Sequence, residues 1–224
     1  MSVLNGYGDK RNPTISNHGV DISAQRADDL DGMALDHLRS IKDQARALDV
    51  ASASGGQAIR MALVGADVLA LDIDDYSEAF HNAASSAGVE RRCGFVQQDI
   101  TEYDVAEKLG RFDVIVCQRM IHYVPYGVAI DIVRTFKEAL KPGGRLYLSA
   151  SGLHSELGTD YPGAQQPIDQ RYELLSDAMV EKHAIMGLVC LYSQDELVSL
   201  LETSGMRVEQ SFTSAFGNVK AVAR

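Results

Sequence analysis

The sequence is poor in cysteine, in basic residues and in long apolar runs, and each shortage excludes a class of protein. Its 224 residues include three cysteines, Cys93, Cys117 and Cys190, which are widely separated and form no Cys-x-x-Cys pair. We therefore expect neither a disulfide framework nor a metal site. The chain has 31 acidic and 21 basic residues, so its net charge is −10. This charge argues against a nucleic-acid partner, since phosphate binding needs a basic face.

The chain also lacks the segments that direct a protein to a membrane. No apolar run approaches the roughly eighteen residues of a membrane span, and the N-terminal residues are polar, without the apolar core of a signal peptide. We expect no membrane partner and a cytoplasmic location, where reduced cysteines persist. The one dense basic pair, Arg91-Arg92, is interpreted as a solvated pair in a loop or at a helix end.

What the chain does contain is a regular alternation of short apolar runs and helical patterns. Strands are expected over 46–51, 67–72, 95–99, 112–117 and 145–150, and helices over 55–64, 75–87, 103–109 and 126–140. This alternation predicts a doubly wound α/β sheet. Further helices are expected over 172–184 and 194–204, and two antiparallel strands over 206–212 and 217–223. The predicted fold is a seven-stranded, mostly parallel sheet with a C-terminal antiparallel hairpin, in three α/β/α layers.

The stretch 46–75 combines a strand, a turn of small residues, a helix and a second strand that ends in acid. Small residues in the turn let a ligand approach the backbone, and the following helix N-terminus offers free N–H groups. Asp72, seventeen positions after Gly55, is placed to accept hydrogen bonds from two ribose hydroxyls. These features predict a pocket for an adenosine-containing cofactor at the carboxyl ends of the strands.

The same residues also have structural interpretations that need no ligand. Asp72 and Asp74 would cap the helix that follows the second strand, and Asp99 would be a turn residue. Cys117 is interpreted as a small buried residue, because nothing beside it would lower the pKa of its thiol.

With these motifs the chain resembles the class I S-adenosylmethionine (SAM)-dependent methyltransferases over roughly residues 45–224. The family's acid followed by three alternating glycines stands here as Asp49, Ala51, Ala53 and Gly55, so alanine replaces two glycines. Asp72 matches the family's ribose-binding acid.

Three further motifs follow at the family's usual spacings. They are the acid-bearing turn Gln98-Asp99-Ile100, the fourth-strand segment 112–123, and the turn and strand 140–146. The resemblance implies SAM as cofactor, with S-adenosylhomocysteine as product. The residues that it implies for cofactor binding are Asp49, Ala51, Ala53, Gly55, Asp72, Ile73, Asp99, Ile100, Cys117 and Gln118.

Each part of SAM has a chemical match in this set. A carboxylate at Asp49 would bind the ammonium group, directly or through water. Asp99 would accept a hydrogen bond from the adenine amine, and Ile73 and Ile100 would sandwich the ring.

The resemblance predicts one domain over 1–224. Within it, 1–45 would form an N-terminal arm and helix that lid the pocket, 46–150 the cofactor-binding half, and 151–224 the substrate-side loop, helices and final strands. A chain of this length suffices for one full α/β domain and is short for two.

The predicted activity is transfer of a methyl group from SAM to an oxygen or nitrogen atom of a small molecule, by a monomer or homodimer. A protein or nucleic-acid acceptor is the second enzyme hypothesis, although the Asn/Asp-Pro-Pro-aromatic signature of base methylation is absent after the fourth strand. The alternative is a non-catalytic binding protein with weakened cofactor binding. Ala51 and Ala53 motivate it, since each would cost about 1 kcal/mol where the backbone needs a positive φ.

A base is needed only if the acceptor carries a proton that must be removed. His122, just past the fourth strand, is the first candidate, and its alternative interpretation is a helix-start residue packed near the sheet edge. His154 and Tyr161, in the loop after the fifth strand, are second candidates, whereas His183 is expected to lie outside the site.

Overall fold

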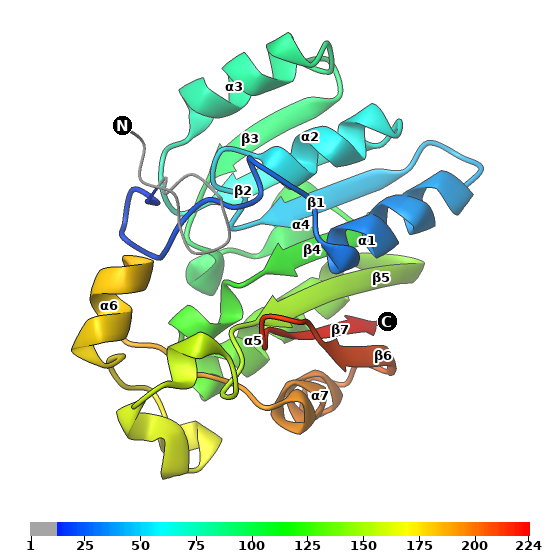
Figure 1. Ribbon diagram of the computed structural model, residues 1–224. Coiled ribbons are helices and arrows are strands. Elements are labelled where there is room, and N and C mark those ends of the chain that lie inside the picture. Colours follow the sequence, from blue (N-terminus) through cyan, green and yellow to red (C-terminus); the bar gives the residue numbers. More distant parts are fainter. Residues whose placement is uncertain (1–12) are drawn as a thin grey trace.

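The computed structural model describes residues 13–224, which contain one seven-stranded sheet (Figure 1). Its strands are β1 (Arg46–Val50), β2 (Asp67–Asp72), β3 (Cys93–Gln97), β4 (Phe112–Gln118), β5 (Leu140–Ala150), β6 (Val208–Thr213) and β7 (Val219–Ala223). They lie in the order β3-β2-β1-β4-β5-β7-β6. The first five are parallel, and β7 runs antiparallel to both β5 and β6. The predicted doubly wound sheet with its C-terminal hairpin is confirmed.

Helices cover both faces of this sheet. They are α1 (Asp29–Ser40), α2 (Gly56–Leu63), α3 (Ser77–Ser86), α4 (Val105–Leu109), α5 (Tyr126–Ala139), α6 (Asp177–His183) and α7 (Gln194–Thr203). Buried residues of α1, α2 and α3 pack on one face, and those of α4, α5 and α7 on the other. Short 3-10 turns are η1 (Ile100–Glu102), η2 (Ile121–Tyr123), η3 (Glu156–Gly158), η4 (Pro162–Gln165) and η5 (Ile168–Gln170). Within residues 13–224, no helix combines the length and apolar character needed to cross a bilayer.

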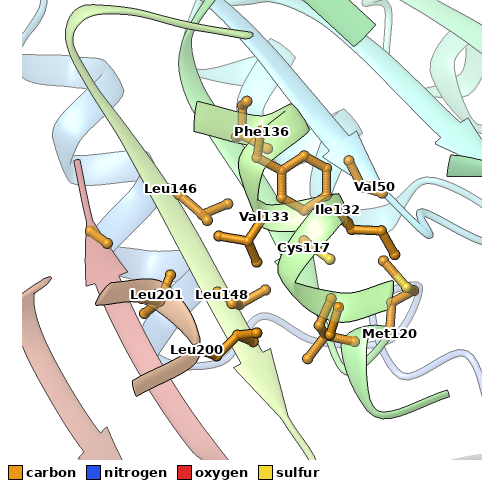
Figure 2. Packing of buried hydrophobic residues seen from close by; sticks show 14 of the residues in the cluster. Val50, Cys117, Met120, Ile132, Val133, Phe136, Leu146, Leu148, Leu200 and Leu201 are labelled. Atoms are coloured by element: carbon orange, nitrogen blue, oxygen red, sulfur yellow. The ribbon is translucent and has the colours of Figure 1, made fainter. Parts of the chain in front are cut away.

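The central strand β4 is apolar on both faces because both faces are covered. Ile115 and Cys117 belong to the core beneath α5, and the alternate residues Val114 and Val116 belong to the core beneath α1 and α2, as the two-residue period of a strand requires. Figure 2 shows the first of these cores, where side chains of α5, β5 and α7 pack together.

Most boundaries differ from the expected ones by one or two residues, and three differences have a bearing on the fold. β3 begins two residues earlier than predicted, at Cys93. β5 begins at Leu140 instead of 145, because Leu140 pairs with Phe112 across a register shift that absorbs the Pro-Gly-Gly turn. The helix expected over 172–184 is the shorter α6, because Glu173 forms an isolated bridge with Val189 instead of a helical turn.

Candidate functional site

The carboxyl ends of β1, β2 and β4 open into a cavity of about 640 Å³. β1 lies between β2 and β4, so the chain order reverses beside it, and this is where open α/β sheets bind ligands. Eight of the ten residues expected to hold a cofactor line this cavity, namely Asp49, Ala51, Ala53, Asp72, Ile73, Asp99, Ile100 and Gln118.

The other two, Gly55 and Cys117, lie outside the cavity. Gly55 precedes α2 with a φ of 85°, and a Cβ there would lie 2.2 Å from the Phe80 ring. Glycine at this position therefore lets α2 start against α3. Cys117 is fully buried in the core, and burial raises the pKa of its thiol.

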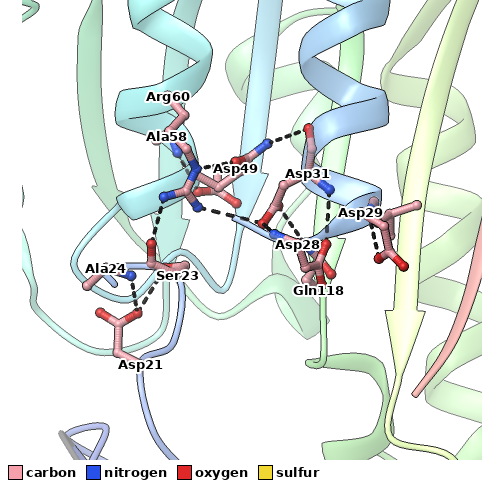
Figure 3. Close-up of polar contacts among 12 residues, drawn as sticks. Asp21, Ser23, Ala24, Asp28, Asp29, Asp31, Asp49, Ala58, Arg60 and Gln118 are labelled. Atoms are coloured by element: carbon pink, nitrogen blue, oxygen red, sulfur yellow. Dashed lines mark hydrogen bonds and ion pairs between the residues drawn. The ribbon is translucent and has the colours of Figure 1, made fainter. Parts of the chain in front are cut away.

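Asp49 is a buried acid at the end of β1, 5% exposed, and its Oδ2 accepts a hydrogen bond of 2.9 Å from the backbone N–H of Ala58 in α2 (Figure 3). Burial, and then the nearby carboxylate of Asp31, raise the pKa of Asp49 to about 8. The charged form of Asp49 is therefore disfavoured until a cation or donor comes close.

Asp72 links the end of β2 to the turn after β1. Its Oδ2 accepts from the backbone N–H of Ala53 at 2.8 Å, and its Oδ1 accepts from the N–H of Asp74 at 3.0 Å. Burial raises its pKa. A carboxylate has about four acceptor positions, so Asp72 keeps acceptor capacity for a ligand that enters the cavity.

The turn between β1 and α2 is left-handed at both alanines. Ala51 has a φ of 55° and Ala53 a φ of 45°, a conformation that glycine adopts freely and alanine at a cost of about 1 kcal/mol. The turn is nevertheless held by hydrogen bonds to Leu71 and Asp72. The two methyl groups strain this turn, but they do not close the cavity, which has its full 640 Å³ with both alanines in place.

An acidic cluster from the start of α1 forms one wall of the cavity. The Gln118 side chain donates to Asp31 Oδ1 at 2.5 Å and to Asp28 Oδ1 at 3.3 Å (Figure 3). The ammonium group of Lys220, on β7, pairs with Asp28 at 2.6 Å and with Asp29. Burial, and then Asp28, raise the pKa of Asp31.

The sequence analysis missed this cluster, although two signals were present. Asp28 and Asp31 have the spacing of a helix capping box, and the structure shows that box. Lys220 interrupts the apolar run of β7 and is 2% exposed, which requires a charged partner.

The cavity as a whole is strongly acidic. Among residues 13–224, three arginine or lysine residues line it, Arg26, Arg119 and Lys220. Nine carboxylates line it, those of Asp21, Asp28, Asp29, Asp31, Asp49, Asp72, Asp74, Asp99 and Glu156. This excess favours a cationic group beside the carboxylates.

His122 lines the cavity but is only 1% exposed. The backbone N–H of Ser151 donates to its Nδ1 at 3.4 Å, and the Ser151 hydroxyl lies 3.2 Å from its Nε2. Burial, and then the charges of Arg119 and His18, lower its pKa to about 3. His122 is therefore a weak base, and its burial and its contacts with Ser151 favour the packed interpretation over the catalytic one.

The two second-rank candidates lie away from the cavity. His154 is exposed on the loop after β5. The hydroxyl of Tyr161 is buried and donates to the carbonyls of Val189, at 2.6 Å, and Arg171. His183, expected outside the site, instead lines the cavity, with its Nε2 3.2 Å from Glu156 Oε2. The expectation for His183 was wrong, because the residues that follow it, Ala184 and Ile185, pair with Gly19 and His18 of the segment that crosses the cavity.

The segment 13–28 crosses the cavity between β2 and α6. On the β2 side, the backbone N–H of Ser16 donates to Asp74 at 3.0 Å. On the α6 side, the N–H of Gly19 donates to the carbonyl of Ala184 at 3.1 Å, and the Tyr123 hydroxyl donates to the carbonyl of His18 at 2.7 Å. Residues 1–12 of the expected arm lie outside the described residues.

Solved structures of similar fold include two methyltransferases. One is 1,6-didemethyltoxoflavin-N1-methyltransferase of Burkholderia thailandensis with bound 1,6-didemethyltoxoflavin and S-adenosylhomocysteine. Its TM-score is 0.64 at 19% identity, and the match covers 91% of this chain and 78% of that chain. The other is the glycopeptide N-methyltransferase MtfA complexed with SAM, with a TM-score of 0.61, 20% identity, and coverage of 89% and 95%. At these identities the likeness establishes the fold.

Curated relatives include the ubiquinone biosynthesis O-methyltransferase of Xanthomonas oryzae pv. oryzae (strain PXO99A). It is 35% identical over 125 residues, which are 54% of this chain and 49% of that protein. The match therefore spans about half the length of this relative. The family model described as "Methyltransferase domain" matches residues 17–211. Because this match covers most of the sequence, the chain belongs to the methyltransferase domain family.

Proposed function

We propose that the protein transfers a methyl group from SAM to an oxygen or nitrogen atom of a small molecule. The observation that carries this proposal is the charge of the cavity, which sets nine carboxylates against three arginine or lysine side chains. SAM brings a sulfonium and an ammonium group, whereas a dinucleotide would bring repelled phosphates to the same walls.

The residues of the cavity fit the parts of SAM. The ammonium group would stabilise the charged form of Asp49, which burial disfavours. Asp72 would accept hydrogen bonds from both ribose hydroxyls, and Asp99 one from the adenine amine. Ile73, an apolar side chain 50% exposed at the cavity, would lose that exposure against the adenine ring, with Ile100 on the other side.

Bound SAM supplies a methyl group on a positively charged sulfur, open to displacement by a lone pair of the acceptor. The main contribution of the chain is to position the two reactants and to exclude water from the cavity. The turn at Ala51 and Ala53 and the carboxylates of Asp49 and Asp72 would fix one reactant, and the segment 13–28, part of the region 1–45 expected to form a lid, would cover it. With a pKa of about 3, His122 is too weak a base to deprotonate an alcohol or ammonium group. His122 therefore does not take the proton, and an acceptor whose lone pair is already free needs no base.

A small-molecule acceptor is supported by the relatives. The curated relative is named for ubiquinone biosynthesis, and a structural neighbour holds 1,6-didemethyltoxoflavin. The net charge of −10 supports a partner other than nucleic acid. We extend the proposal to a cytoplasmic monomer or homodimer.

A non-catalytic binding protein is the second candidate, and the positive φ angles of Ala51 and Ala53 favour it. The strained turn would then bind cofactor weakly, without methyl transfer. Turnover of SAM with any small acceptor would exclude this candidate.

Calorimetric titration with S-adenosylhomocysteine and SAM tests the proposal. We expect Asp72→Ala to weaken binding about 10- to 100-fold, the range for hydrogen bonds to a charged group. Asp67→Ala is the matched control, because it removes a half-exposed carboxylate from the opposite end of the same strand. Absence of binding to the intact protein, or equal binding by the Asp72 variant, would contradict the proposal.

A further inference from the structure

Arg119 is a cavity cation whose charge no carboxylate of the described residues neutralises by contact. Lys220 pairs with Asp28 and Asp29, and the guanidinium of Arg26 lies 5.8 Å from the centre of the Phe216 ring. Among residues 13–224, the side chain of half-buried Arg119 makes neither a hydrogen bond nor an ion pair. A cation held in a cavity in this way is available to a ligand.

The backbone of Arg119 is strained and firmly held. Its φ is 53°, in the left-handed region that a long side chain rarely adopts. Its N–H donates to the carbonyl of Ser149 at 2.9 Å and lies 3.1 Å from the Ser149 hydroxyl, which in turn donates to Gln118 at 3.2 Å. Strained residues that are fixed by their surroundings gather at ligand sites.

Along the chain, Arg119 lies between two groups of residues that line the cavity. On one side, the preceding residue Gln118 binds the acidic cluster of Asp28 and Asp31, which suits an ammonium group. On the other side are His122 and Tyr123, whose protonation the Arg119 charge already influences. Residues 119–124, which follow β4, include no carboxylate, and five of them line the cavity.

We propose that Arg119 binds an anionic oxygen of the methyl acceptor, a carboxylate or a phenolate, so that the acceptor belongs to the organic acids. This inference rests on the proposed function and narrows its substrate class. The guanidinium is always charged, and its planar fork matches an oxyanion better than an ammonium group would. The exposed ring of Phe216, 46% exposed at the same cavity, suits an acceptor with an aromatic body.

The test uses benzoate and its neutral counterpart benzamide as probes of the protein saturated with S-adenosylhomocysteine. Ligand-observed NMR measures both dissociation constants. We expect benzoate to bind about tenfold more tightly than benzamide. Arg119→Met, which keeps the length of the stem, should remove that preference, and Arg119→Lys should keep part of it. Equal binding of the two probes by the intact protein, no benzoate binding at about 10 mM, or an unchanged preference in Arg119→Met overturns the inference.

SAM itself carries a carboxylate, so a second arm separates the cofactor from the acceptor. S-adenosylhomocysteine has this carboxylate and 5′-methylthioadenosine lacks it. We expect Arg119→Met to leave the affinity for both within about twofold. A loss of affinity for S-adenosylhomocysteine alone would assign Arg119 to the cofactor and overturn the inference. Failure of the proposed function would appear differently, as absent or Asp72-independent binding of S-adenosylhomocysteine.

Discussion

At the scale of single residues, Asp49 shows how a site residue opposes stability. Its carboxyl group is buried beside Asp31, and its pKa of about 8 lies above the value of 3.8 for an exposed aspartate. Between these two pH values the folded chain keeps a proton that the unfolded chain has released. Stability therefore falls as pH rises through this window, because the unfolded state binds fewer protons.

Asp49→Asn should stabilise the protein, with a gain that grows from pH 4 to pH 8. The asparagine oxygen can still accept the hydrogen bond from Ala58. We expect a gain of at least about 1.4 kcal/mol at pH 8, the equivalent of one pKa unit. Urea unfolding at several pH values measures it, with Asp67→Asn as control. A difference that stays constant with pH would show that Asp49 is ionised in the folded protein.

At the scale of elements, the turn between β1 and α2 carries the chain's departure from the family pattern. Ala51, Ala53 and Gly55 all have a positive φ, so the backbone follows the path for which three glycines are suited. A Cβ on Gly56 would lie 2.1 Å from the carbonyl oxygen of Ser23. The turn is thus pressed between the strand end and the segment that crosses the cavity.

Ala53→Gly should raise the free energy of unfolding by about 1 kcal/mol, because it relieves a φ of 45°. Ala58→Gly, five residues further on in the first turn of α2, is the control and should lower it by about 1 kcal/mol or more. Denaturant midpoints at constant m-value measure both changes. Destabilisation by Ala53→Gly would mean that the alanine methyl packs usefully in the turn.

The sequence predicted elements where the pattern is local. β2 was predicted to the residue, and so was the capping box of Ser193 and Glu196 that begins α7. β5 was misplaced at its start, because the pairing of Leu140 with Phe112 depends on a bulge that no periodicity reveals.

For the site, sequence motifs located the acids at the ends of strands. They missed the acids at the start of α1, which only tertiary packing brings to the cavity. Asp49, Asp72 and Asp99 lie near the carboxyl ends of predicted strands, and the topology brings them to one cavity. The cluster of Asp28 and Lys220 joins positions 192 residues apart, and no local pattern specifies such a pair. The positive φ angles of Ala51 and Ala53 could likewise be established only from the folded backbone.

At the scale of the whole molecule, the segment 13–28 ties the two sides of the cavity together. Asp74 accepts hydrogen bonds from the N–H and the hydroxyl of Ser16, and the Tyr76 hydroxyl accepts from the N–H of Ile15. On the far side, the N–H of Gly19 reaches the end of α6. These contacts must therefore open before a ligand can leave the cavity.

Asp74→Ala should speed the dissociation of S-adenosylhomocysteine about tenfold, since it removes two hydrogen bonds that hold the segment closed. The association rate should change less. Stopped-flow displacement measures both rates. Asp75→Ala is the control, because Asp75 binds the N–H of Ser77 and does not contact the segment. Equal dissociation rates in the two variants would show that the segment does not limit release.

The bond between Lys220 and Asp28 has a consequence for biosynthesis. Asp28 leaves the ribosome 192 residues before its partner, so during translation the start of α1 carries carboxylates without their cation. The acidic wall of the cavity is completed when β7 inserts between β5 and β6. A nascent chain that has already formed β1 to β5 therefore holds the carboxylates of Asp28 and Asp29 without their ammonium partner until β7 is in place.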